Sequence, residues 1–147
     1  MSSTISFKTE VPIYASCDVV VCGGGPSGCA AALAARREGL RVILIEGMGQ
    51  LGGMAVTALV SQWLGGRTQE GEWVVGGIFR SLSEEAAAKG YAVLPSLDSN
   101  RKYHPYGWYN WFIHGVPLDP YSIDLFLDQK MKDAGVQVLL HTEVMDA

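Results

Sequence analysis

The chain has few charged residues and few cysteines. Charged side chains make up 18% of its 147 residues and the formal net charge is −4, so no basic excess attracts nucleic acid or an anionic membrane surface. The three cysteines have no CxxC spacing and suggest no disulfide framework, which favours a reducing, cytoplasmic location. No apolar run reaches the roughly 18 residues of a membrane helix. We therefore expect a soluble protein whose partner is a small molecule held in a pocket.

Metal ligands and catalytic groups are also scarce. His104 and His114 do not stand at a metal-ligand spacing, so the sequence predicts no metal site and a structural role for both histidines. No pattern identifies a catalytic residue. A hydrophobic content of 48% and the length of one ordinary domain predict a single globular unit with a buried core.

Residues 18–46 carry the strongest pattern in the chain. A β-branched run at residues 19–21 is followed by closely spaced glycines and by an alanine-rich stretch, residues 27–37, that ends at Gly39. A second apolar run, residues 42–45, leads directly to Glu46. Strand, glycine turn, helix and strand in this order predict a βαβ unit of the dinucleotide-binding type.

Three glycines of the turn each have a physical reason. Gly23 allows a tight turn out of the strand, Gly25 allows a diphosphate to approach the backbone, and Gly28 allows the helix to pack closely on the strand. The free N–H groups at the start of the helix and its dipole, about half an elementary charge, then face the phosphates. Ser27 can add its own N–H and hydroxyl. The sequence thus predicts an anion site that needs no lysine or arginine.

Two features after the second strand complete the predicted site. Glu46 stands about 20 residues beyond the glycines, where a carboxylate accepts hydrogen bonds from an adenosine ribose and repels a 2′-phosphate. The adjacent Gly52 and Gly53 predict a second close-approach loop, which we interpret as another wall of the diphosphate site. A plain turn is the alternative interpretation of this pair.

The cysteines have mainly structural interpretations. Cys17 and Cys22 flank the first strand and are expected to be small apolar side chains in a core. Cys29 falls in the first turn of the phosphate-facing helix, where the helix dipole would favour a thiolate. Close packing of a small side chain is the alternative for Cys29.

The chain divides into four predicted segments. They are a lead-in arm (1–16), the βαβ unit with the second glycine loop (17–62), an aromatic-rich insertion (63–118), and a helix and strand returning to the sheet (119–147). A loop or small hairpin is expected at 63–77 and a helix at 78–89. Asp119 and Pro120 predict the start of the last helix and Gly135 its end, before a strand at 136–140.

With these motifs the sequence resembles the N-terminal part of FAD-dependent oxidoreductases with a glutathione-reductase-like fold, especially flavoproteins in which an acid is followed by LGGM. The matching stretches are DVVVCGGGPSGCAAALAARREGLRVILIE, LGGMA, VGGIFRSL and PLDPYSIDLFLDQKMKDAGVQVLLHTEV. The resemblance implies that the glycine turn binds the FAD pyrophosphate, that Glu46 binds the ribose and that the backbone near Val144 contacts the adenine. The expected cofactor-binding residues are Gly23, Gly24, Gly25, Pro26, Ser27, Gly28, Glu46, Gly47, Gly52, Gly53, Met54 and Val144.

The expected fold class is α/β, a Rossmann-like FAD/NAD(P)-binding fold whose parallel sheet has flanking helices. It is expected to be incomplete at the C-terminus, because the family's distal glycine–aspartate segment is not in the sequence. The expected function is the adenosine and pyrophosphate half of a flavin-dependent oxidoreductase, with FAD as cofactor and an unknown small-molecule substrate. The alternatives are an NAD-binding dehydrogenase domain and a non-catalytic nucleotide-binding or assembly subunit. We also expect exposed apolar surface, with self-association or a completing C-terminal chain.

Overall fold

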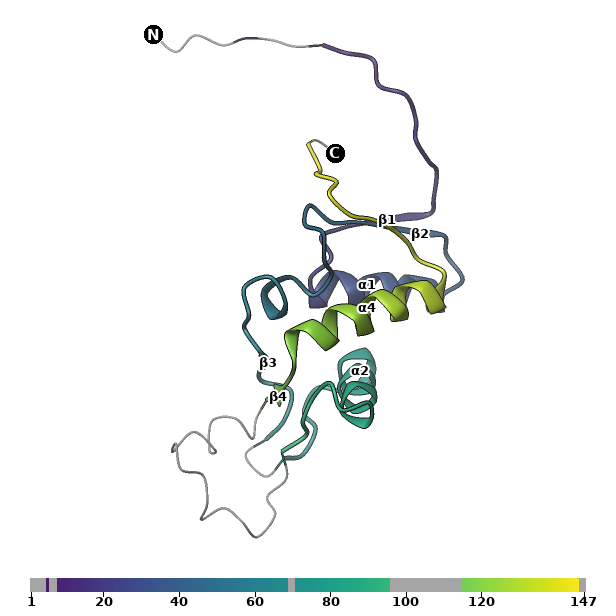
Figure 1. Ribbon diagram of the computed structural model, residues 1–147. Coiled ribbons are helices and arrows are strands. Elements are labelled where there is room, and N and C mark those ends of the chain that lie inside the picture. The colour runs from purple at the N-terminus through teal and green to yellow at the C-terminus, as the bar shows by residue number, and fades with distance from the viewer. Residues whose placement is uncertain (1–4, 6–7, 69–70, 96–114, 146–147) are drawn as a thin grey trace.

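The computed structural model describes residues 5, 8–68, 71–95 and 115–145. Figure 1 shows its elements in chain order, which are β1 (Val19–Cys22), α1 (Pro26–Arg37), β2 (Val42–Ile45), the 3-10 turn η1 (Gly53–Ala55), β3 (Gln62–Trp63), α2 (Gly77–Ala88), β4 (Val116–Pro117), α4 (Pro120–Ala134) and β5 (Gln137–Leu139). The helices and strands predicted within the described residues are all present, with bounds within two residues of those expected.

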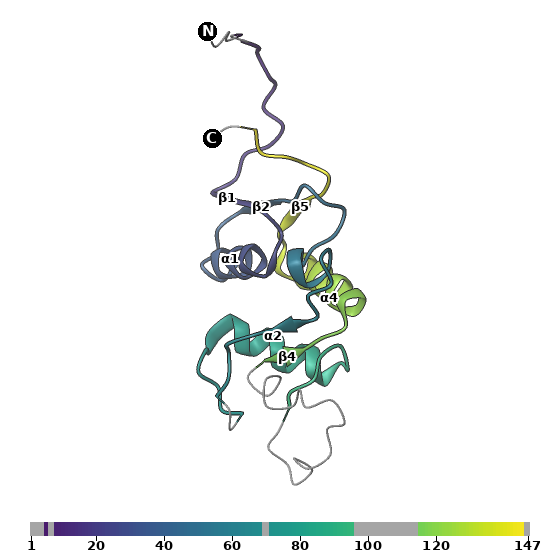
Figure 2. The ribbon, with the colours of Figure 1, turned by 90° about the vertical axis from the view of Figure 1, so that its left-hand side faces the viewer.

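The main sheet is parallel, with the strand order β1-β2-β5. Val19 pairs with Val42 across the first two strands, and Ile43 pairs with Gln137 across the next two. Figures 1 and 2 show α1 and α4 side by side against one face of this sheet, with α2 and the β3–β4 ribbon beyond them. The predicted α/β class, a parallel sheet with flanking helices, is confirmed.

Local signals explain where the helices begin and end. In α1, Pro26 occupies the first turn, and Gly39 follows the helix with a φ of +80°. In α4, the Asp119 carboxylate caps the N-terminus by accepting a hydrogen bond of 3.2 Å from the Ser122 N–H. Gly135 ends α4 with a left-handed φ of +72°. These termini were predicted because capping depends on a few neighbouring residues.

The core lies between the sheet and the two helices that cover it, and it continues to α2 and β4 through Leu82 and Val116. Its fully buried side chains include Leu44 from β2, Leu51 from the second glycine loop, and Ile123, Leu127 and Met131 from α4. Residues from each part of the βαβ unit therefore share one apolar cluster with the last helix. Burial of such large side chains, worth about 1.5–3 kcal/mol each, holds the glycine loops in place.

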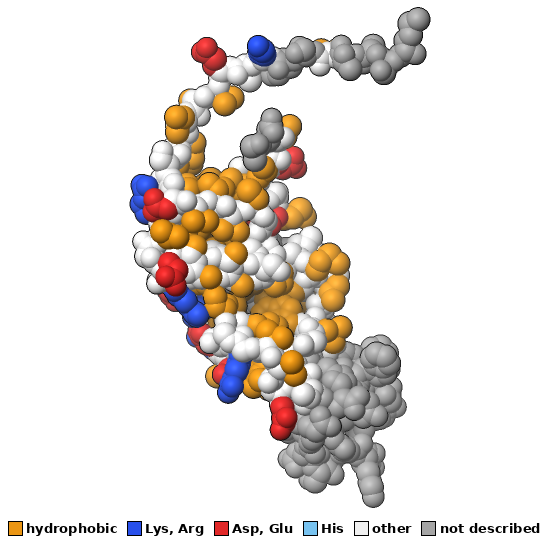
Figure 3. Space-filling model, turned by 180° about the vertical axis from the view of Figure 1, so that it is seen from behind, with side chains coloured by type: hydrophobic (Ala, Val, Ile, Leu, Met, Phe, Trp, Pro, Cys, Tyr) orange, Lys and Arg blue, Asp and Glu red, His pale blue; other side chains and the backbone are white. Residues whose placement is uncertain are grey.

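The other face of the sheet is not covered by any helix among the described residues. Along β1, Val20 is 51% exposed and Cys22 is exposed, whereas Val19 and Val21 pack against the core. The expectation that Cys22 is a core side chain is therefore wrong, and Cys17 is only half-buried. Figure 3 shows further hydrophobic side chains at the surface, which agrees with the expected exposed apolar area.

The arm that precedes the sheet, residues 8–16, contains no strand and runs away from the body (Figure 1). Where the arm meets β1, Asp18 pairs with Arg41 at the start of β2, with an Nη2–Oδ1 distance of 2.9 Å. The hydrogen bonds from Arg41 lower the pKa of the Asp18 carboxyl. This exposed pair ties the entrances of the two strands together.

Part of the predicted aromatic insertion lies outside the described residues, including His104, His114 and the aromatic side chains between positions 103 and 112. In the described part, an isolated antiparallel bridge pairs Arg67 with Trp73, within the stretch where a loop or small hairpin was expected. No described helix is both long and apolar enough to cross a membrane.

Candidate dinucleotide-binding site

The turn between β1 and α1 requires glycine at two positions. Gly23 has a φ of +100°, which L side chains rarely adopt. A Cβ on Gly28 would overlap the carbonyl oxygen of Gly23, so any larger residue would push α1 away from the strand. The predicted reasons for these two glycines, a tight turn and a close approach of helix to strand, are confirmed.

The N-terminus of α1 is left open. Gly25 is its N-cap, no side chain caps the helix, and no acidic residue lies in its first turn. A Cβ on Gly25 would meet no atom within 4 Å, so the space in front of this residue is empty. Ser27 is exposed in the same turn. Free N–H groups and open space at a helix N-terminus suit an anionic group.

The second glycine loop lies directly against the first. The Gly52 N–H donates a hydrogen bond of 2.8 Å to the Gly24 carbonyl, and a Cβ on Gly53 would stand 3.0 Å from the Gly25 Cα. Both residues have positive φ values, +101° and +48°. The structure therefore brings Gly52 and Gly53 beside the first glycine turn. This position is the one required if the loop forms a second wall of the diphosphate site.

Asp124, on α4, anchors this second loop and was not identified from the sequence. Its Oδ1 accepts a hydrogen bond of 3.1 Å from the N–H of Leu51, whose side chain is fully buried. The only signal in the sequence is an acidic residue between the apolar Ile123 and Leu125, which is also compatible with a solvated position. The contact connects α4 to the glycine site.

Glu46 follows β2 and turns its half-buried carboxylate toward the first glycine turn. Its Oε2 accepts a hydrogen bond of 2.6 Å from the Gly24 N–H, and its Oε1 accepts one of 2.7 Å from the Met48 N–H. Each carboxylate oxygen can accept a further hydrogen bond. The two backbone donors therefore fix the carboxylate in one orientation while leaving capacity for a ligand.

The segment after β5 lies against the loop that follows Glu46. The Thr142 N–H donates to the Glu46 carbonyl at 3.0 Å, and a Cβ on Gly47 would lie 3.7 Å from the Glu143 Cγ. Val144 and Met54, two other predicted binding residues, are 47% and 66% exposed. Their contact with a nucleotide stays a prediction, as do the binding roles of Gly24, Pro26 and Gly47.

Cys29 is a packing residue and not a thiolate. Its side chain is fully buried, and its Sγ donates to the Gly24 carbonyl at 3.3 Å. Burial raises the pKa of this thiol to about 12, so it is protonated at neutral pH. Of the two interpretations that the sequence left open, close packing is therefore correct.

A mainly apolar cavity of about 380 Å³ opens beside the start of α1. It is lined by Pro26, Ser27, Ala30, Gln62, Trp63, Leu64, Phe79, Leu82 and Leu127. A larger groove of about 650 Å³ runs between α2 and α4 among side chains of both charges, away from the glycine loops. Within the described residues, no group of three or more His, Cys, Asp or Glu side chains could hold a metal ion.

The fold is of the Rossmann-like α/β type, and its candidate site combines an open helix N-terminus with the nearby Glu46 carboxylate. The chain belongs to the FAD dependent oxidoreductase family, whose model matches residues 18–147. The thioredoxin reductase of Ureaplasma parvum is 46% identical over 48 residues, which are 33% of this chain and 16% of that protein. The chain is therefore part of an FAD-dependent oxidoreductase.

Solved structures share the fold at low sequence identity. The L-amino acid deaminase from Proteus vulgaris has a TM-score of 0.55 and 16% identity, covering 92% of this chain and 42% of that chain. The p-nitrophenol 4-monooxygenase from Pseudomonas putida has a TM-score of 0.53 and 13% identity, and the match covers 86% of this chain and 32% of that chain. The chain thus spans less than half the length of these proteins, and at these identities the likeness shows the fold alone.

Proposed function

We propose that this chain supplies the adenosine- and diphosphate-binding part of the FAD site in a flavin-dependent oxidoreductase. The observation that carries the proposal is the uncapped N-terminus of α1, which is bordered by Gly25 and Gly53 and lies next to the Glu46 carboxylate. The family match supports FAD over a nicotinamide dinucleotide as the ligand.

In this proposal the diphosphate lies in the open space before Gly25. The N–H groups of Ser27 and Gly28, in the first turn of α1, would donate hydrogen bonds to its oxygens, and the Ser27 hydroxyl could add another. The helix dipole, equivalent to about half a positive charge, would neutralise part of the diphosphate. Gly53 on the facing loop would let the second wall approach the phosphates equally closely.

The ribose of the adenosine would lie at Glu46. The carboxylate, held by the backbone N–H groups of Gly24 and Met48, would accept hydrogen bonds from the ribose hydroxyls. Its negative charge would repel a 2′-phosphate. Gly47 and the backbone near Val144 would border the adenine, and Met54 would lie beside the phosphates.

The bound flavin supplies the electron-transfer chemistry, and the residues of this chain bind and orient its adenosine end. An unknown small-molecule substrate and a cytoplasmic location belong to the same proposal. So does a partner, either a completing chain or a second copy, over the face of the sheet where Val20 and Cys22 are exposed. Covering apolar side chains on that face would favour the association.

Replacement of Glu46 tests the ribose contact. Hydrogen bonds to a charged group contribute about 1.5–3 kcal/mol, so Glu46→Ala is expected to weaken ADP binding by about tenfold to a hundredfold. Glu46→Gln should weaken it less, because the amide oxygen can still accept a hydrogen bond. The measurement is a calorimetric titration of ADP into the wild type and both variants.

The same titration with 2′-phospho-ADP provides the control. The wild type should bind it more weakly than ADP, and Glu46→Ala should lose most of this preference. Equal ADP binding by all three proteins, or a wild-type preference for the 2′-phosphorylated ligand, would place the ribose away from Glu46.

A further inference from the structure

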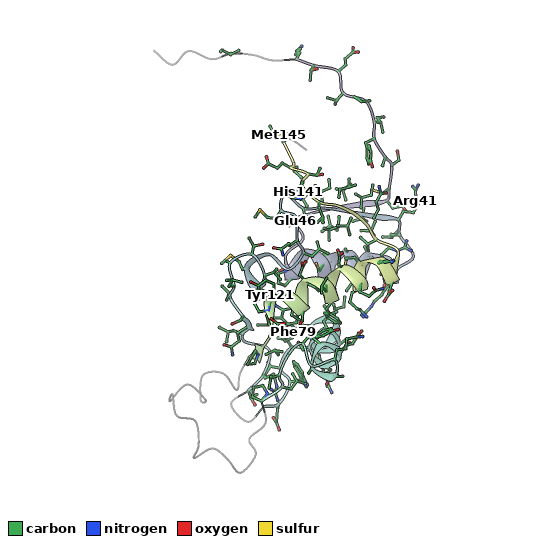
Figure 4. The ribbon with its side chains drawn as sticks, viewed as in Figure 1. Arg41, Glu46, Phe79, Tyr121, His141 and Met145 are labelled. Carbon is green, nitrogen blue, oxygen red and sulfur yellow. The ribbon has the colours of Figure 1, made fainter. Side chains whose placement is uncertain are left out.

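His141, which follows Leu140 at the end of β5, has an unusual backbone conformation. Its φ is +52°, in the left-handed region that non-glycine residues seldom occupy, and its side chain is exposed. Such a conformation costs free energy and persists where surrounding contacts hold it. Figure 4 places His141 at the same end of the sheet as Glu46.

The imidazole ring of His141 rests on Gly49. A Cβ on Gly49 would lie 2.7 Å from both the Cε1 and the Nε2 atoms of the ring, so an alanine at this position would displace the ring. The φ of Gly49 is not in the left-handed region, so its backbone does not itself require glycine. The absence of a side chain at position 49 is therefore what allows the ring of His141 to lie there.

Hydrogen bonds connect this contact to the Glu46 carboxylate. The His141 N–H donates to the Met48 carbonyl at 3.1 Å, and the Met48 N–H donates to Glu46 Oε1 at 2.7 Å. The next residue, Thr142, donates its N–H to the Glu46 carbonyl at 3.0 Å. Met48 thus lies between His141 and the carboxylate, held from both sides.

We propose that His141 is a positioning residue for recognition of the ribose. Its ring holds Gly49, and its N–H holds Met48, so that the Met48 N–H keeps the Glu46 carboxylate turned toward the ribose hydroxyls. His141 acts through the loop and does not have to touch the nucleotide. The inference rests on the proposed function, because it assigns a role in a ribose contact made by Glu46.

The most direct test removes the two atoms of the His141 ring that lie nearest to where a Cβ of residue 49 would be. His141→Asn removes Cε1 and Nε2 but keeps a residue that tolerates the left-handed region, so the backbone conformation is retained. Gly49→Ala displaces the ring from the opposite side. Gly76→Ala is the matched control, because a Cβ there meets no atom within 4 Å and Gly76 has a φ of −92°.

The variants are titrated calorimetrically with ADP and with 2′-deoxy-ADP, which lacks one of the hydroxyls that Glu46 would bind. His141→Asn and Gly49→Ala are each expected to weaken ADP binding about fivefold, the equivalent of part of one charged hydrogen bond. Binding of 2′-deoxy-ADP should change less than about twofold, since its 2′ contact is already missing. The double variant should bind ADP no more weakly than His141→Asn, because without the ring Gly49→Ala has nothing to displace.

Three results would overturn the inference. These are unchanged ADP binding by His141→Asn, equal losses for ADP and 2′-deoxy-ADP, and losses that add in the double variant. A wild type that binds ADP no better than 2′-deoxy-ADP would overturn the proposed ribose contact together with this inference. A preference for ADP that survives His141→Asn would overturn this inference alone.

Discussion

Gly28→Ala is expected to lower the free energy of unfolding by at least about 4 kcal/mol, or to prevent folding altogether. The added Cβ would overlap the backbone carbonyl of Gly23, which cannot move without distorting the turn after β1. Relief of the overlap requires α1 to move away from the sheet, with loss of packing around Cys29 and Leu33. Urea unfolding followed by circular dichroism measures the effect.

Gly39→Ala, at the other end of α1, is the matched control for this prediction. Its φ of +80° makes alanine unfavourable, but a Cβ there would meet no atom within 4 Å. We expect a loss of about 1 kcal/mol, the usual cost of the conformation alone. Similar losses for the two variants would contradict the close approach of helix and strand.

Gly25→Ala is expected to fold normally and yet to weaken ADP binding at least about a hundredfold, since two charge-assisted hydrogen bonds would be lost. Gly25 has a φ of −67°, and its Cβ would point into open space. In the proposed function, that space is where the diphosphate approaches the N–H groups of α1. The measurement pairs an ADP titration with a thermal unfolding curve for the same protein.

Gly76→Ala controls for the loss of a glycine N-cap. Gly76 caps α2 as Gly25 caps α1, without a side-chain hydrogen bond and with open space around its Cβ. Both variants share the cost of an alanine at an N-cap, but only Gly25→Ala should affect ADP. If Gly25→Ala binds ADP like the wild type, the diphosphate does not lie at this helix.

The elements around the glycine turn could be predicted because their signals are local. Gly23 and Gly39 mark positive φ values, and Asp119 with Pro120 marks the start of α4. A β-branched run before the glycines and an apolar run after the helix predicted the positions of the first two strands. The spacing of the glycines predicted the close approach of α1 to the strand at Gly28, and the structure shows it.

Features that depend on distant contacts could not be predicted. Cys22 is exposed because no helix among the described residues covers its face of the sheet. The residues around β1 do not indicate which face will be covered. Asp124 contacts Leu51 across 73 positions in the sequence, so neither residue signals the other. Cys29 lies where the helix dipole favours a thiolate, and only the packing around it shows that burial raises its pKa.

His141 illustrates the same limit within the site. In the sequence it is a lone histidine near the end of a predicted strand, and Gly49 is one of several glycines in a loop. The pairing of Met48 with His141 requires β5 to lie beside β2, which follows from the order of the sheet and not from either segment. The residues that we propose to orient the Glu46 carboxylate can therefore be identified only from the three-dimensional structure.

A titration of the wild-type chain with FAD, ADP and FMN tests the central claim most directly. FAD and ADP share the adenosine and the diphosphate, whereas FMN carries the flavin without either. If this chain holds the adenosine and diphosphate end of the cofactor, FAD and ADP should bind with similar affinity and FMN should not bind measurably. Binding of FMN, or of neither FAD nor ADP, would contradict the account.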